Sequence, residues 1–112
     1  MKLDIFFNWP PGENSARVDL GMANVEDVQK DFRVGVMPAT HPGRIAWHEA
    51  GWVRGRNVEG KFQFSVKRGD KVVVEQRLSG EENADAKLVI DTDEKWPAEA
   101  HGPTHVDQGW TF

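Results

Sequence analysis

The side chains best suited to chemistry gather in one short stretch of this chain. Residues 41–52, HPGRIAWHEAGW, contain two histidines, two tryptophans and a glutamate. Imidazole and carboxylate groups ligate metal ions and transfer protons, and tryptophan is enriched in binding hot spots. The stretch completes no catalytic or metal-binding motif, so its role depends on the elements that position it.

A metal site is one hypothesis for the four histidines of the chain. His101 and His105 have the spacing of neighbours on one helix face, but Gly102 and Pro103 between them disfavour a helix. Histidine nitrogen and carboxylate oxygen together would suit a divalent ion such as zinc, iron, nickel or manganese. The candidate ligands are His41, His48, Glu49, His101 and His105, with Asp107 as a substitute for Glu49. The corresponding function is a histidine-ligated metal-binding enzyme or sensor, with the glutamate as ligand or general base.

Tryptophan offers a second kind of site. The chain has five tryptophans and six phenylalanines but no tyrosine, a mixture that suits a core or a stacking surface better than proton chemistry. Proline or glycine adjoins Trp9, Trp96 and Trp110, at places where chains turn and side chains reach the surface; the alternative is that these three plug the ends of the fold. The candidate binding residues are Trp47, His48 and Trp52, followed by Trp9, Trp96 and Trp110.

Several other chemistries find no support in the sequence. The absence of cysteine excludes disulfides, thiol nucleophiles and thiolate zinc sites. No serine lies in a Gly-x-Ser-x-Gly elbow, and no glycine-rich loop has the Lys-Ser/Thr ending of a phosphate-binding loop. The acidic run DTDE, residues 91–94, lacks the glycine and terminal glutamate of a helix–loop–helix calcium site. We therefore assign no catalytic residue and no cofactor.

Strands must position these candidates, because apolar and polar residues alternate along most of the chain. KLDIFFNW, residues 2–9, places Leu3, Ile5 and Phe7 on one face, and similar alternation recurs through residue 91. Residues 24–32 instead have helical spacing. The pattern predicts a single mainly β domain over residues 1–112, an antiparallel sandwich or small barrel of about six to seven strands with one short helix. From about residue 96, prolines and glycines predict an irregular tail ending in a short strand around residues 110–112.

Residues 61–79, KFQFSVKRGDKVVVEQRLS, contain two alternating runs around Arg-Gly-Asp and predict a β-hairpin. A three-residue loop would pair Val66 with Val72 and Phe64 with Val74. This register keeps the apolar side chains on one face, whereas a slip of one residue would turn a whole strand inside out.

The alternation also predicts a strand over residues 44–54, which include most of the HPGRIAWHEAGW stretch. Over residues 44–54, Trp47 and Glu49 would face one way and His48 the other, so His48 and Glu49 would not form an acid–base pair. Gly51 permits a bulge that resets the alternation before Trp52. The simplest interpretation puts Trp47 in the core and His48 on the surface.

The net charge of the chain limits the classes of partner that it can bind. A net charge of −4 disfavours binding to nucleic acid or to acidic membranes, and no run is long and apolar enough to span a bilayer. Asp4 interrupts the first apolar run, so we expect no signal peptide and a soluble, cytoplasmic protein. We predict a non-catalytic binding module for a protein partner with a basic face, such as an inhibitor, immunity or accessory protein. Self-assembly through an exposed strand edge is a further expectation, and a carbohydrate-binding module with exposed tryptophans is another alternative.

Overall fold

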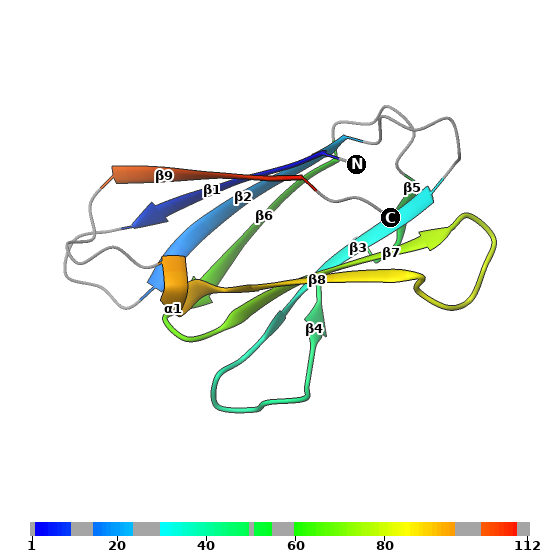
Figure 1. The fold of residues 1–112 in the computed structure, drawn as a ribbon. Coiled ribbons are helices and arrows are strands. Elements are labelled where there is room, and N and C mark those ends of the chain that lie inside the picture. The colour runs from blue at the N-terminus through cyan, green and yellow to red at the C-terminus, as the bar shows by residue number, and fades with distance from the viewer. Residues whose placement is uncertain are drawn as a thin grey trace.

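Two antiparallel sheets packed face to face make up this protein (Figure 1). The computed structural model describes residues 2–9, 15–23, 30–49, 51–54, 60–95 and 102–109. Sheet A has the strand order β6-β2-β1-β9, and sheet B has the order β4-β3-β7-β8, with β5 also paired to β3. The strands of sheet A are β1 (Lys2–Trp9), β2 (Ser15–Ala23), β6 (Gly60–Lys67) and β9 (Gly102–Gly109). Those of sheet B are β3 (Lys30–Met37), β4 (Ala46–Trp47), β5 (Val53–Arg54), β7 (Lys71–Leu78) and β8 (Ala86–Asp91).

The core lies between the inward faces of the two sheets. In β1 and β2, alternate residues with described side chains are buried, as the period of two requires. The predicted mainly β antiparallel fold is confirmed, and of the two predicted architectures, sandwich or small barrel, the structure is the sandwich. Burying each large apolar side chain contributes roughly 1.5 to 3 kcal/mol. The core residues are Ile5, Phe7, Ala16, Val18, Leu20, Phe32, Val34, Phe62, Val66, Val72, Val74 and Ile90.

The β-hairpin predicted for residues 61–79 is wrong. β6 pairs with β2 in sheet A, whereas β7 pairs with β3 and β8 in sheet B, so the intervening turn crosses from one sheet to the other. Val66 and Val72 are both buried in the same core, as their alternation predicts, but they belong to opposite sheets. Alternation determines which side chains share a face, and either arrangement buries both apolar faces.

Hydrogen bonds around Asp70 hold this crossing turn. The Asp70 carboxylate accepts from the backbone N–H of Lys67 at 2.8 Å and from that of Ala39 at 3.1 Å. Thr92 Oγ1 donates to the Asp70 carbonyl at 2.6 Å and accepts from the Gly69 N–H at 3.1 Å. Gly69 has a φ of 92°, in the left-handed region that favours glycine. The network joins the turn to the β3–β4 loop and to the start of the short helix α1 (Thr92–Lys95).

The helix predicted near residues 24–32 is not confirmed. Residues 30–32 belong to β3, and residues 24–29 lie outside the described residues. Phe32 has helical spacing from Val25 and Val28, but it also alternates with Val34. In the structure Phe32 and Val34 are both buried residues of β3, so the strand alternation prevails. In the described part of the chain, no helix is long and apolar enough to cross a membrane.

The end of the chain also differs from expectation. Residues 102–109 form β9, which pairs with β1 at the edge of sheet A, where the sequence predicted an irregular tail. Pro103 disfavoured a strand because proline has no backbone N–H to donate. An edge strand tolerates proline, since the backbone groups on one of its sides pair with no neighbouring strand. Residues 96–101 and the strand predicted around residues 110–112 lie outside the described residues.

Candidate functional site

β4 and β5 together form an interrupted edge strand along β3. Trp47 of β4 lies opposite Gly35, and Val53 of β5 lies opposite Phe32. The chain between these two pairs is longer on the β4–β5 side than on β3, so the extra residues bulge out of the ladder. The part of residues 41–52 that contains Trp47, His48, Glu49 and Trp52 therefore lies along the edge of sheet B.

A turn at Gly51 resets the alternation within this edge. The Gly51 N–H donates to the His48 carbonyl at 2.9 Å, and Gly51 has a φ of 61°. Trp47 and Trp52 are an odd number of residues apart, so in an unbroken strand they would face opposite sides. Instead both rings contact Arg33, which confirms the predicted reset.

Tryptophan and arginine alternate on the outer face of sheet B. Arg33 lies between the buried residues Phe32 and Val34 of β3, so its side chain leaves the opposite face. Its guanidinium carbon lies 3.7 Å from the ring centroid of Trp47 and 4.5 Å from that of Trp52. The guanidinium carbon of Arg77, on β7, lies 4.2 Å from the Trp52 centroid. We call this set the tryptophan–arginine stack: Trp47, Arg33, Trp52 and Arg77.

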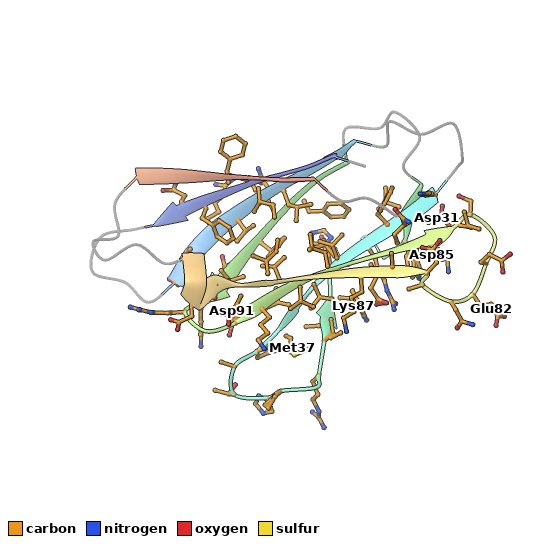
Figure 2. The ribbon with its side chains drawn as sticks, in the orientation of Figure 1. Asp31, Met37, Glu82, Asp85, Lys87 and Asp91 are labelled. Carbon is orange, nitrogen blue, oxygen red and sulfur yellow. The ribbon has the colours of Figure 1, made fainter. Side chains whose placement is uncertain are left out.

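Two carboxylates orient the arginines of the stack. Arg33 donates from Nη2 and Nε to Glu75 Oε1 at 2.8 and 3.2 Å. Arg77 Nε donates to Asp31 Oδ2 at 3.2 Å, and Ser79 Oγ donates to Asp31 Oδ1 at 2.7 Å. The Asp31 and Glu75 side chains are 9% and 13% exposed, so these ion pairs are screened less than surface pairs. Asp31 is labelled in Figure 2, at one end of sheet B.

Glycine at position 35 lets the Trp47 ring approach the sheet. A Cβ on Gly35 would lie 2.7 Å from Ile45 Cγ2, 2.8 Å from Trp47 Cε3 and 2.9 Å from the Ala46 carbonyl oxygen. Real Cβ atoms do not make such contacts, so any other residue here would displace β4. The stack therefore depends on the missing side chain as well as on those present.

The prediction that Trp47 faces the core and His48 the surface is wrong. Trp47 lies on the outer face against Arg33, and the His48 ring points between the sheets toward Phe62 of β6. The His48 and Phe62 rings meet edge to face, with centroids 5.2 Å apart and planes at 84°. Both Trp47 and His48 are half-buried. Alternation requires only that they diverge, and the pairing of β4 with β3 determines which faces outward.

The candidate metal ligands are spread over the fold. His41 is exposed in the β3–β4 loop, where its Nδ1 lies 2.9 Å from Thr40 Oγ1, and Glu49 is exposed beside the inward-pointing His48. Among the residues that the structure describes, no three histidine, aspartate or glutamate side chains converge to hold a metal ion. His105 belongs to β9 in sheet A, opposite Phe6, and His101 lies outside the described residues.

Of the six tryptophan and histidine binding candidates, the structure brings two tryptophans together. Trp9 ends β1 in sheet A, opposite Gly102, while Trp96 and Trp110 lie outside the described residues. Sequence reasoning missed the charged members of the site. Their signal was present, because β3 and β7 each carry an acid and an arginine two positions apart, and antiparallel pairing places each acid opposite an arginine. These residues are Asp31, Arg33, Glu75 and Arg77.

The polar groups of the site are mutually satisfied: both carboxylates accept hydrogen bonds from the arginines of the stack. Comparison of the chain with known protein families, curated proteins and solved structures finds no match.

Proposed function

We propose that this protein is a non-catalytic binding module that contacts a protein partner through the tryptophan–arginine stack. The observation that carries the proposal is the stack itself, with Arg33 between Trp47 and Trp52 and with Arg77 over Trp52. Tryptophan and arginine are among the residue types most enriched in the hot spots of protein interfaces, where a few side chains supply most of the binding energy.

Order within the stack supports this role. Arg33 is held by both rings and by Glu75, and Arg77 is held by Trp52 and Asp31. Immobilising one flexible side chain on binding costs roughly 0.5 to 1.5 kcal/mol, and that cost falls when the side chain is already held in place. The site can therefore bind without first ordering its two longest side chains.

Charge around the stack favours a basic partner. Asp31 and Glu75 already neutralise the two arginines, and the loop after β7 adds the exposed acids Glu81, Glu82 and Asp85. In Figure 2, Glu82 and Asp85 lie at the same end of sheet B as Asp31. We infer a partner that offers an apolar or aromatic anchor bordered by lysine or arginine, consistent with the net charge of −4.

A carbohydrate ligand fits the stack less well. Sugars bind tryptophan through an uncovered ring face. A guanidinium group already covers at least one face of Trp47 and of Trp52. The arrangement therefore favours the protein-binding hypothesis over the carbohydrate-binding one.

The test compares two aromatic positions on opposite sheets, the half-buried Trp52 of the stack and the exposed Phe6. The immobilised protein, Trp52→Ala and Phe6→Ser are used to capture proteins from cells that express this chain, with bound species quantified by mass spectrometry. Phe6 is the control because it is 44% exposed on the outer face of sheet A. We expect a partner whose capture falls at least about tenfold with Trp52→Ala and is unchanged with Phe6→Ser.

Circular dichroism establishes that both variants are folded. A partner retained equally by Trp52→Ala and the unmodified protein, or lost equally with both variants, contradicts the proposed site. Arg77→Ala provides a second variant on the stack, and it should reduce capture of the same partner.

A further inference from the structure

β8 forms the edge of sheet B opposite the β4–β5 edge, which carries the two tryptophans of the stack. In the strand order of the described residues it neighbours only β7 (Figure 1). Val89, at the middle of β8, is 45% exposed, and Lys87 is exposed as well. An edge of this kind presents backbone N–H and C=O groups that can pair with another strand.

The hydrogen-bond register shows which groups β8 presents. Residues of β7 and β8 pair so that Lys71 lies opposite Asp91 and Val73 opposite Val89. The Thr92 N–H donates to the Asp70 carbonyl at 3.1 Å, in line with this register, so even-numbered residues of β8 direct their backbone groups to β7. The outward-directed groups are therefore the N–H and C=O of Lys87 and Val89 and the N–H of Asp91.

The other side of sheet B gives the same result. The His48 N–H donates to the Val34 carbonyl at 2.8 Å, so Val34 directs its backbone groups to β4. Val34 pairs with Val74 of β7, so Val74 directs its own groups away from β3 and toward β8. Val74 in turn pairs with Leu88, an even-numbered residue of β8.

The outer-face side chains of β8 are complementary in charge to those of a second, antiparallel β8. Lys87, Val89 and Asp91 share the outer face of β8, because the alternate residues Leu88 and Ile90 pack against the core. In an antiparallel pair of two β8 strands centred on Val89, Lys87 of each copy lies opposite Asp91 of the other. Opposite charges directly across a strand pair are stabilising, whereas like charges are destabilising.

We propose that this chain forms a symmetric dimer by antiparallel pairing of β8 with β8 of a second copy, centred on Val89. The Val89 N–H of each copy donates to the Val89 carbonyl of the other, and the Asp91 N–H donates to the Lys87 carbonyl. A two-fold axis relates the copies, as in most homodimers. Leu88 of each copy lies opposite Ile90 of the other, so the core face also continues across the junction.

Charge placement makes the edge selective for its own copy. Lysine on an edge strand discourages pairing with unrelated strands. In the proposed dimer Lys87 lies opposite Asp91 of the second copy, in addition to Glu75 of β7 in its own chain. The two tryptophans of the stack lie at the other edge of sheet B, so dimerisation leaves them open to a separate partner.

Sedimentation of the full chain tests the proposal. We expect the mass to rise with concentration from 12.6 kDa toward twice that value. Lys87→Asp or Asp91→Lys alone should raise the dimer dissociation constant at least about tenfold, because each places like charges opposite one another. An equimolar mixture of the two variants should recover the dimer, since each lysine again meets an aspartate.

Two further variants separate pairing from folding. Val89→Pro removes an N–H that faces the open edge and not β7, so the protein should stay folded by circular dichroism and become monomeric. Trp52→Ala should leave the mass unchanged. A chain that remains monomeric at millimolar concentration overturns the proposal, as does a dimer insensitive to Val89→Pro or a mixture that does not recover.

Discussion

Two buried carboxylates at opposite ends of sheet B have different kinds of partner. Asp70 accepts hydrogen bonds from the backbone N–H groups of Lys67 and Ala39. Asp31 accepts from the side chains of Arg77 and Ser79. One carboxylate therefore fixes the path of the chain, and the other fixes side chains on an outer face.

The difference separates stability from recognition. The Asp70 carboxylate joins the backbone of the crossing turn to that of the β3–β4 loop, so its loss should lower the stability of the fold. Arginine side chains at the surface can instead hydrogen-bond to water, so losing the Asp31 carboxylate should mainly change the geometry of the stack and have less effect on stability. The four predictions that follow test this division, from the largest expected effect to the smallest.

Replacing Asp70 should be the most damaging change. Asp70→Ala removes a charged acceptor that holds two backbone N–H groups and should lower the free energy of unfolding by about 3 kcal/mol. Asp70→Asn keeps one acceptor oxygen, so its free energy of unfolding should lie between those of Asp70→Ala and the unmodified protein. Urea unfolding followed by circular dichroism measures both, and a loss for Asp70→Ala below about 1 kcal/mol would contradict the structural role of the turn network.

A methyl group at Gly35 should rank second. Gly35→Ala forces Ile45, Trp47 and the Ala46 carbonyl apart and should cost about 2 kcal/mol, with a change in tryptophan fluorescence as the stack opens. Gly21→Ala is the matched control, because a Cβ there meets nothing within 4 Å. Equal effects of the two substitutions would show that close approach at Gly35 is unimportant.

Arg33→Lys should cost about 1 kcal/mol. Lysine keeps a positive charge near Glu75 but loses the planar stacking between Trp47 and Trp52 and the two-nitrogen contact with the carboxylate. We expect the fluorescence of both tryptophans to shift while the unfolding midpoint moves little. If instead the protein unfolds as readily as Asp70→Ala, the stack is a folding element and the division fails.

The smallest effect is expected at the ion pair of Arg68 and Asp93. Its side chains are 53% and 59% exposed, although the pair adjoins the Asp70 turn. Asp93→Ala should change the free energy of unfolding by less than about 0.5 kcal/mol, because exposed pairs gain little over hydration. A loss comparable to that of Asp70→Ala would mean that proximity to the turn, and not backbone bonding, sets the cost.

Much of the fold was predictable from local pattern. The alternation of Ile5 and Phe7 and of Val72 and Val74 places these residues inside, and all four are buried. The reset at Gly51 was predictable too, since glycine adopts the left-handed conformation that the turn requires. These features depend on residues that are close in sequence.

The candidate site was predictable only in part. The sequence identifies Trp47 and Trp52, but it does not reveal that Arg33 joins them, because the partner that orients Arg33 is 42 residues away at Glu75. The wrong outward assignment of His48 has the same origin, since alternation sets relative faces and leaves the absolute face to the packing of β4.

The sequence by itself therefore determined that this chain is a β protein and which residues within each strand share a face. Only the tertiary structure decided which strands adjoin, which placed β6 and β7 in opposite sheets and brought two tryptophans and two arginines into one stack. The reason is physical: the period of two follows from backbone geometry at each residue, whereas strand neighbours follow from burying all the apolar faces at once.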